Sequence, residues 1–361
     1  MIPLIVDLET EWRGGQNQAL LLLKGLYERG HAAELISAHG SSLGHRAKKE
    51  GIYVHSVSRG KLRFAAAAKI RSLLADGRIE VVHVNEAHAL TAAWLALPKG
   101  TPPLVASRRV GFPLKRGWLS QKRYRRADLI LANSLWVAEQ AAASGAPKEK
   151  IRVVYEGVEV PALPTDTARA AARKRFSLDG SQMVLGCVGA LEKDKGHEWV
   201  IRALAELRNE FPNCKLLIAG EGEYRRELTV LARELNCHDR VVFAGFLKDI
   251  TAVYEAIDVF VFPSLFEGLG TSLLSAMSYA VPSITFSGCA LGEIVENQVS
   301  GIQVDARNAA AIAEAAGQIL RQPECAKKLG QAGRARIGEK FSAERMVENT
   351  LAIYEELIGR A

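Results

Sequence analysis

The second half of the chain contains DVFVFPSLFEGLGTSLLSAMSYAVP at residues 258–282, and this stretch predicts a strand, a glycine turn and a helix. The β-branched and aromatic run from Asp258 to Phe262 is typical of a buried parallel strand. Gly268 and Gly270 let a backbone pass close to a ligand. Free N–H groups at the start of the following helix bind phosphate or a hydroxyl. Glu267 would repel bare phosphate but accepts hydrogen bonds from hydroxyls, so the pairing predicts a nucleotide-sugar site.

The same stretch resembles the signature of the family-4 retaining glycosyltransferases. That signature is Pro-Ser, then Glu-Gly, then a glycine and a helix with a second Glu eight positions after the first, then Ala-Met-Ala-x-Gly-x-Pro. The matching positions are Pro263-Ser264, Glu267-Gly268, Ala276-Met277 and Pro282, whereas Ser275 replaces the second Glu. The resemblance extends over nearly the whole chain. It implies the α/β GT-B fold, with two Rossmann-like domains facing across a cleft and a C-terminal helix returning to the first.

Composition places the chain among ordinary globular proteins of more than one domain. It has 361 residues, of which 48% are hydrophobic and 24% charged; this length exceeds one comfortable core. No apolar run approaches the roughly 18 residues that span a bilayer. The first twelve residues carry three acids and no base, which is wrong for a signal peptide. We therefore expect a cytoplasmic protein. The five cysteines include no Cys-x-x-Cys pair, so we expect neither a metal site nor disulfides.

Strand-like and helical segments alternate from end to end, which predicts two parallel α/β sheets. The expected domains are residues 1–160, residues 161–341 and a helix in 342–361 that packs back on the first domain. A segment rich in Pro, Thr and Ala, residues 161–172, is predicted to be the linker. The expected strands are 3–8, 33–37, 81–85, 104–107, 129–133 and 151–155 in the first domain, and 183–188, 215–219, 241–244, 258–262, 283–286 and 301–304 in the second.

The resemblance implies a donor site built mainly from loops of the second domain. Lys195, before Gly196, matches the lysine that clamps the diphosphate, but Ala190 stands where the family has an arginine. Glu267 would orient the sugar, and Lys195 would stabilise the leaving diphosphate together with a glycine loop that opens a helix near residue 16. The implied donor-binding residues are Gly14, Gly15, Lys195, Gly222, Phe246, Leu247, Glu267, Gly268, Leu269, Gly270, Thr271 and Ser275.

The acceptor is expected at the first domain. His83, Asn85 and His88 lie at the end of a predicted strand, where open α/β sheets bind ligands. For each histidine, a buried ring with satisfied hydrogen bonds is the competing interpretation. The family places a sugar-contacting histidine at the end of the next strand, where this chain has Arg108-Arg109. Arg109 is therefore the third expected catalytic residue, beside Glu267 and Lys195, and Arg108 is expected to contact the acceptor.

Positive charge is concentrated in the first domain. Residues 1–160 hold 24 Lys and Arg against 14 Asp and Glu, and the remainder of the chain holds 23 against 26. Between Arg108 and Arg126 there are eight basic residues and no acid, interleaved with Phe112, Leu114, Trp118, Leu119 and Tyr124. A solvated helix face is the usual meaning of such a run. The interleaved apolar residues favour instead an anionic inner-membrane surface or a phosphorylated acceptor bound through residues 108–126.

The predicted function is a retaining glycosyltransferase that moves a sugar from a nucleotide-sugar to an envelope glycan or glycolipid such as lipopolysaccharide core. The donor is a substrate based on UDP, GDP or ADP, and no cofactor and no nucleic-acid partner are expected. Two alternatives stay open. A non-catalytic or partner-activated GT-B scaffold would explain Ala190 and Ser275, and a GT-B nucleotide-sugar epimerase or phosphorylase would share the fold.

Overall fold

The computed structural model describes residues 1–98, 102–114 and 118–359, with the side chain of Leu119 left aside. The chain divides into two compact units. Unit 1 combines Met1–Gly157 with Ala343–Ala361, and unit 2 is the continuous segment Val158–Ser342. The chain therefore leaves unit 1 after residue 157 and returns to it after residue 342.

Unit 1 is built on a seven-stranded parallel sheet with strand order β3-β2-β1-β4-β5-β6-β7. The order reverses between β1 and β4, so the loops after these two strands diverge and leave a crevice for ligands at the carboxyl edge. The strands are β1 (Pro3–Asp7), β2 (Glu34–Ala38), β3 (Tyr53–Val57), β4 (Val81–Val84), β5 (Leu104–Arg108), β6 (Leu129–Ala132) and β7 (Ile151–Val153).

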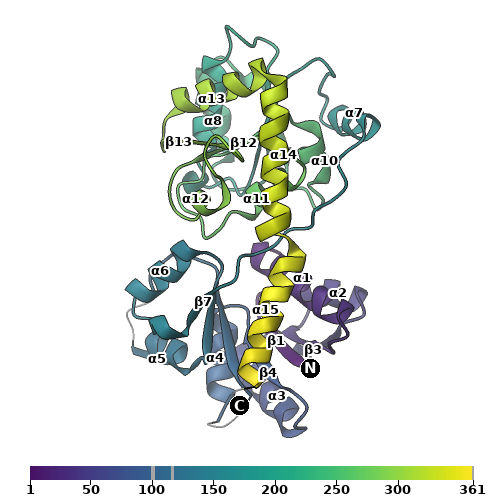
Figure 1. Cartoon of the computed structure of the whole chain (residues 1–361), viewed down its shortest axis with the longest axis vertical. Helices are drawn as coiled ribbons and strands as arrows, with labels where there is room; N and C mark the ends of the chain where they lie inside the picture. The colour runs from purple at the N-terminus through teal and green to yellow at the C-terminus, as the bar shows by residue number, and fades with distance from the viewer. Residues whose placement is uncertain (99–101, 115–117, 360–361) are drawn as a thin grey trace. The chain divides into compact units, whose positions relative to one another are not determined.

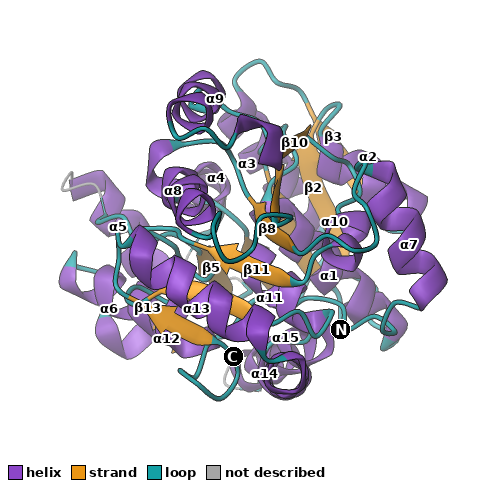
Figure 2. Cartoon of the chain, turned by 90° about the horizontal axis from the view of Figure 1, so that it is seen from above, coloured by secondary structure: helices purple, strands orange, loops and turns teal. Residues whose placement is uncertain are grey.

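Helices cover both faces of this sheet (Figures 1 and 2). Side chains alternate along β1, so that Leu4 and Val6 join the core under α3 and α4 while Ile5 joins the core under α1 and α15. The helices of unit 1 are α1 (Gly14–Glu28), α2 (Ser42–Lys49), α3 (Leu62–Ala75), α4 (Ala87–Ala96), α5 (Trp118–Arg126), α6 (Leu135–Ala143), η1 (Lys148–Lys150) and α15 (Ala343–Ile358).

Unit 2 repeats the plan with six parallel strands in the order β10-β9-β8-β11-β12-β13, and its order reverses between β8 and β11. Its strands are β8 (Val184–Val188), β9 (Lys215–Ala219), β10 (Val241–Gly245), β11 (Val259–Phe262), β12 (Ser283–Phe286) and β13 (Ile302–Val304). Its helices are α7 (Asp166–Arg175), η2 (Lys193–Lys195), α8 (His197–Glu206), α9 (Arg225–Glu234), η3 (His238–Arg240), α10 (Thr251–Ala256), α11 (Thr271–Ser278), α12 (Leu291–Ile294), α13 (Ala309–Arg321) and α14 (Pro323–Lys340).

Three sequence-based expectations need correction. Strand β3 was not predicted, because Tyr53 and Ser56 of this edge strand are exposed and interrupt the apolar pattern. The expected linker 161–172 is helical from Asp166, with the Thr165 side chain accepting a hydrogen bond from the Ala168 N–H as an N-cap. Gly14 and Gly15 form the first turn of α1 and not a turn before it.

The C-terminal helix α15 is part of unit 1 and lies beside α1 (Figure 1). A Cβ added to Gly25 of α1 would lie 2.5 Å from Val347, so only glycine allows this close contact. Met346, Val347 and Tyr354 are buried against the sheet, and Leu351 and Leu357 are half-buried there. The Tyr354 hydroxyl pairs with Nδ1 of His83, whose Nε2 lies 2.7 Å from the Ser107 hydroxyl.

Ala280, directly after α11, has φ = +58°, a left-handed conformation that glycine adopts without cost. For an alanine this conformation costs roughly 1–2 kcal/mol. We expect Ala280→Gly to raise the free energy of unfolding by about 0.5–1 kcal/mol, because the relieved strain exceeds the added entropy of the unfolded glycine. Urea unfolding measures the change. Ala276→Gly, inside the helix, should instead destabilise by about 1 kcal/mol or more, and a loss of stability in both variants would contradict the strain.

Candidate functional site

Four loops interlock at the carboxyl edge of the unit 2 sheet, after β8, β9, β10 and β11. Their glycines face neighbouring carbonyl oxygens. A Cβ at Gly220 would lie 1.8 Å from the Gly189 oxygen, one at Gly222 would lie 2.3 Å from the Leu191 oxygen, and one at Gly196 would lie 2.1 Å from the Pro263 oxygen. Gly196 and Gly220 also have positive φ angles. Glycine is therefore required for the loops to approach one another this closely.

Lys195 and Glu267 meet in this set of loops. Lys195 ends η2 and Glu267 follows β11, and the Lys195 Nζ donates to the Glu267 Oε1 at 2.7 Å. The Ser264 hydroxyl donates to the same oxygen at 3.1 Å. The two side chains are 23% and 17% exposed, so a charged pair lies within reach of a ligand without being fully solvated. The backbone holds the pair, because the Leu265 N–H donates to the Asp194 oxygen at 2.8 Å.

The start of α11 lies directly after Glu267. Gly270, with φ = +101°, is the residue before the helix, and its α-carbon faces the Phe262 ring so closely that a Cβ would lie 3.0 Å away. Leu269 is buried and anchors the turn, whereas Gly268 and Thr271 are half-buried. Gly270, the N-cap residue, has no side chain to accept a hydrogen bond from the first N–H groups of α11, so the start of this helix can offer N–H groups to an anion.

The other predicted donor residues are dispersed around these loops. Gly222 closes the loop after β9, Phe246 after β10 is 65% exposed, and Leu247 is half-buried. The Ser275 side chain, in the middle of α11, hydrogen-bonds the buried Tyr254 hydroxyl. The exposed Ala190, after β8, brings no cation to the loops. Their donor-binding roles stay predictions.

Gly14 and Gly15 belong to unit 1, at the carboxyl edge between β1 and β4. Asn85 joins this edge to α1, since its Nδ2 donates to the Gly15 oxygen at 3.1 Å and to the Asp7 carboxylate. Gln16 also donates to Asp7, at 2.9 Å. Burial raises the pKa of the Asp7 carboxyl, although the bonds from Asn85 and Gln16 act in the opposite direction.

Arg109 follows β5 and turns toward the same edge. Its Nη1 donates to the Asn85 oxygen at 2.8 Å, its Nε lies 2.8 Å from a Glu156 carboxylate oxygen, and its Cδ lies 3.7 Å from the place of a Cβ on Gly15. The structure thus brings Gly15, Asn85 and Arg109 together. Arg108 points elsewhere: it donates to the Phe112 carbonyl and, at 3.5 Å, to the Tyr124 hydroxyl.

His83 lines the same small cavity as Arg109 and Glu156, but its ring is engaged within the protein. It is 3% exposed, both its ring nitrogens have partners inside the protein, and burial lowers its pKa to about 3. The ring is neutral and both of its nitrogens are bonded, which agrees with the competing interpretation of a buried, satisfied histidine. Contact between His83 and the acceptor stays a prediction.

His88 is exposed and takes hydrogen bonds from Arg63 on its Nδ1. With Glu9 and Glu86 it offers ligand atoms within 4.8 Å of one another. The Glu86 carboxylate, however, already accepts the N–H groups of Leu8, His88 and Ala89 as the cap of α4. Burial raises the pKa of Glu86 to about 7. We interpret the group as a helix cap and not as a metal centre.

Several residues of these two edges were not predicted from the sequence. Asp7 accepts from the predicted Asn85 and also from Gln16, Glu156 pairs with Arg109, and Ser264 bonds to Glu267. His197, the first residue of α8, is 1% exposed, and neither ring nitrogen has a partner among the described residues. Burial lowers its pKa to about 4, so the ring is neutral. Of these unpredicted residues, Ser264 could have been found from the sequence, since it lies in the Pro263-Ser264 part of the family motif.

Both halves of the chain match known families. Residues 12–160 match the description "Glycosyltransferase Family 4" and residues 168–336 match "Glycosyl transferases group 1". A GDP-mannose-dependent α-(1-6)-phosphatidylinositol monomannoside mannosyltransferase of Mycolicibacterium smegmatis is 30% identical over 74% of this chain and 74% of its own length. An uncharacterized glycosyltransferase of Methanocaldococcus jannaschii is 28% identical over 66% of this chain. That alignment spans 63% of the archaeal protein.

The fold is shared with solved structures. HepE of Anabaena, in complex with UDP and glucose, superposes with a TM-score of 0.85 over 99% of this chain and all of its own, at 20% identity. This likeness, with the two strand orders above, confirms the expected α/β GT-B fold class. Because the family matches cover both units and the mycobacterial relative spans about three quarters of each chain, this protein belongs to the group 1, family-4 glycosyltransferases.

Proposed function

We propose that the protein transfers a sugar from a nucleotide-sugar to a glycolipid acceptor, with retention of the anomeric configuration. The observation that carries the proposal is the Lys195–Glu267 pair beside the uncapped start of α11. An ammonium and free N–H groups suit a diphosphate, and a carboxylate in the same turn suits sugar hydroxyls. A binding site for phosphate alone has no use for the carboxylate.

In this proposal Lys195 and the N–H groups at Leu269 to Thr271 stabilise the charge that develops on the departing diphosphate. Such fixed donors act on the transition state more strongly than on the ground state. Glu267 orients the sugar through its hydroxyls. The acceptor hydroxyl approaches on the side of the leaving group and gives its proton to the departing phosphate, which retains the configuration. Within the first unit, Gly14, Gly15, Asn85 and Arg109 are the residues expected to bind substrate.

The relatives suggest which donors to test, and the charge of the chain suggests the kind of acceptor. The mycobacterial relative is named for GDP-mannose and a phosphatidylinositol glycan, and HepE was solved with UDP and glucose. UDP-glucose and GDP-mannose are therefore the first donors to test. The basic first half of the chain favours an acceptor that lies in an anionic membrane, at its cytoplasmic face. The specific acceptor that we propose is lipopolysaccharide core. Among the described residues, no helix has both the length and the apolar character to cross a bilayer.

Two measurements test the proposal. A thermal-shift comparison of UDP, GDP, ADP and CMP identifies the nucleotide, since a ligand at a hundred times its dissociation constant stabilises by roughly 2.7 kcal/mol. The matching labelled donor is then incubated with membrane glycolipids, and we expect a labelled lipid with the anomeric configuration of the donor. Inverted product would overturn the retaining mechanism, and an epimerised donor without any acceptor would favour the epimerase.

A non-catalytic scaffold is the second candidate, because Ala190 and Ser275 replace side chains that the family uses to hold its donor. The scaffold would bind nucleotide and neither transfer the sugar nor hydrolyse the donor. Slow hydrolysis of the donor in the absence of acceptor discriminates the two, since it requires a working Lys195–Glu267 pair.

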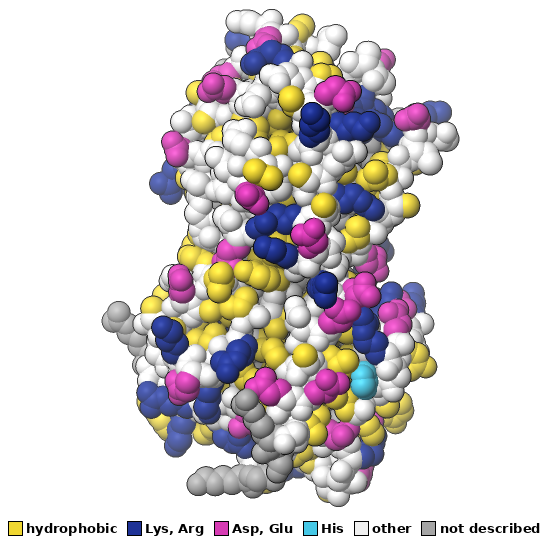
Figure 3. Space-filling view, in the orientation of Figure 1, with side chains coloured by type: hydrophobic (Ala, Val, Ile, Leu, Met, Phe, Trp, Pro, Cys, Tyr) yellow, Lys and Arg dark blue, Asp and Glu magenta, His cyan; other side chains and the backbone are white. Residues whose placement is uncertain are grey.

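A basic, aromatic surface on unit 1 is the proposed membrane contact. Trp118, Lys122 and Arg125 are exposed on one face of α5, and Lys122 lies over the Trp118 ring at 5.2 Å. Phe112, 59% exposed, precedes them. In Figure 3, blue Lys and Arg side chains gather at the lower left, over the part of unit 1 that contains α5. Other basic residues of the run are engaged internally, since Arg123 donates to Thr91 and Arg126 to the Pro98 oxygen. Lys115 and Arg116 lie outside the described residues.

We expect the double substitution Lys122→Gln and Arg125→Gln to weaken binding to vesicles that contain anionic lipid by about tenfold to thirtyfold, since each basic residue near such a surface contributes about 1 kcal/mol. The effect should shrink with added salt, because the screening length falls to about 8 Å at physiological ionic strength. Vesicle sedimentation measures it. The matched control is Arg226→Gln with Lys328→Gln, two exposed residues of unit 2. Equal weakening by both pairs would show a non-specific charge effect.

A further inference from the structure

Unit 2 contains a cavity of about 460 Å³ that the proposed function does not use. Its floor is formed where β8, β11 and β12 begin, by Met183, Asp258 and Pro282 among others. Lys195, Glu267 and the start of α11 lie after the ends of β8 and β11. Because the strands are parallel, the cavity and the donor loops lie at opposite edges of the sheet. A ligand in this cavity would not contact the donor.

The walls are apolar and aromatic. Tyr254 and Tyr279 stack with ring centroids 5.5 Å apart, and Ile319 and Leu320 of α13 also line the cavity. Both the volume and the lining are typical of pockets for small organic molecules, which lie between roughly 300 and 1,000 Å³. Ala280, which has the strained φ angle of +58°, forms part of the wall. Strained backbone of this kind is concentrated at binding sites.

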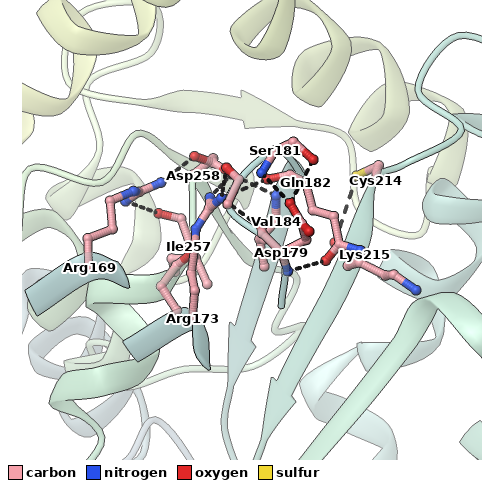
Figure 4. A network of polar contacts seen from close by, with 12 residues as sticks. Arg169, Arg173, Asp179, Ser181, Gln182, Val184, Cys214, Lys215, Ile257 and Asp258 are labelled. Carbon is pink, nitrogen blue, oxygen red and sulfur yellow. Dashed lines mark hydrogen bonds and ion pairs between the residues drawn. The ribbon is translucent and has the colours of Figure 1, made fainter. Parts of the chain in front are cut away.

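The charged groups at the cavity leave an excess of positive charge. Asp258, the acid among its lining residues, receives hydrogen bonds from Arg169 and, at 2.8 Å, from Arg173 (Figure 4). The Arg173 guanidinium donates hydrogen bonds to this carboxylate and to the backbone oxygens of Ala256, Gly180 and Gln182. One carboxylate thus faces two guanidinium groups. Arg169, the one that lines the cavity, also donates to the Glu255 and Ile257 oxygens at 3.2 Å, so it adds positive charge near a ligand while keeping its own bonds.

Two further features add positive potential. Lys327 lines the cavity, is exposed, and has no ion-pair partner among the described residues. The first turn of α14, an 18-residue helix, contributes Pro323 and Ala326 to the lining, so the positive end of its dipole lies at the cavity, although the same turn also carries Glu324. A purely apolar ligand would fill the space but would not compensate this positive potential.

We propose that this cavity binds a small amphipathic carboxylate, with an aromatic or short acyl body between Tyr254, Tyr279 and α13 and its carboxylate toward Lys327 and Arg169. The site is distinct from the donor site and adds a non-catalytic ligand to the protein. Tyr254 gives it a physical connection to α11, because its hydroxyl donates to the Ser272 oxygen at 3.3 Å.

The test is a calorimetric titration of the whole protein with 4-phenylbutyrate. A second titration with 4-phenylbutanol, its neutral isostere, gives the comparison. We expect the carboxylate to bind at least about fivefold more tightly than the alcohol, and Lys327→Gln to remove most of that difference. Lys328→Gln, the neighbouring exposed lysine outside the cavity, should leave it unchanged. Saturating UDP should not displace the probe.

Four results would overturn the proposal. They are no binding of the carboxylate, equal binding of acid and alcohol, equal loss in Lys327→Gln and Lys328→Gln, and competition with UDP. Tyr279→Trp, which keeps an aromatic wall while filling the space, provides a second check, because it should weaken the acid and the alcohol alike if both occupy the cavity. Unchanged binding in Tyr279→Trp would place the probe elsewhere.

Discussion

Replacing Lys195 with Ala is expected to lower the rate of sugar transfer by at least about a hundredfold, the usual cost of removing one fixed donor from developing negative charge. The substitution removes the ammonium that lies 2.7 Å from Glu267 and leaves that carboxylate without its cation. An unpaired carboxylate would also repel the diphosphate, so donor affinity should fall with the rate. Steady-state transfer rates and nucleotide titration measure the two effects.

The matched control is Lys193→Ala, in the same short helix. Lys193 is exposed and lies outside the pair, so both activity and affinity should be retained. Glu267→Gln keeps the shape of the side chain and weakens its charge-assisted bonds, so we expect a loss of about tenfold, which corresponds to about 1.4 kcal/mol. Full activity in both Lys195→Ala and Glu267→Gln would exclude the proposed donor site.

Replacing Arg173 with Ala should lower the free energy of unfolding of unit 2 by about 3 kcal/mol, near the lower limit for breaking a buried ion pair. Arg173 is 6% exposed, and its guanidinium joins α7 to the Asp258 carboxylate and to four backbone oxygens. The loss leaves buried carbonyl groups without donors. Arg169 still donates to Asp258 in this variant, so the loss of unfolding free energy should not exceed this value by much.

Denaturant unfolding measures this change, and Lys174→Ala is the control, since Lys174 is exposed on the same helix. It should change stability by less than about 0.5 kcal/mol. If Arg173→Ala were as stable as Lys174→Ala, the network of Figure 4 would have no energetic importance.

The sequence predicted elements whose pattern is local and missed contacts between distant residues. The buried strands β9 and β12 follow from continuous apolar runs, and their bounds match the expected 215–219 and 283–286. Strand β3 escaped because an edge strand has exposed positions that break the run. Lys195 and Glu267 are 72 positions apart, and only the family resemblance suggested that they share a site.

The same limit applies to the first unit. His83 has the local features of a ligand-binding histidine, because it is polar and close to a strand end. Its ring nitrogen is instead bonded to the hydroxyl of Tyr354, 271 positions later in the chain. Asp7 lies in an apolar strand, and nothing near it in sequence indicates that Asn85 and Gln16 would satisfy its carboxylate. Partners of this kind depend on tertiary packing, which a local pattern does not contain.

The position of α15 has a consequence for synthesis on the ribosome. Residues 1–157 emerge first, yet part of one face of their sheet is covered by residues 343–358, which emerge after the whole of unit 2. At about 5 to 20 residues per second, some 200 further residues take between about 10 and 40 seconds. During that interval the apolar surface that receives Met346, Val347 and Tyr354 is uncovered, and we expect chaperones to bind the nascent first unit until α15 docks.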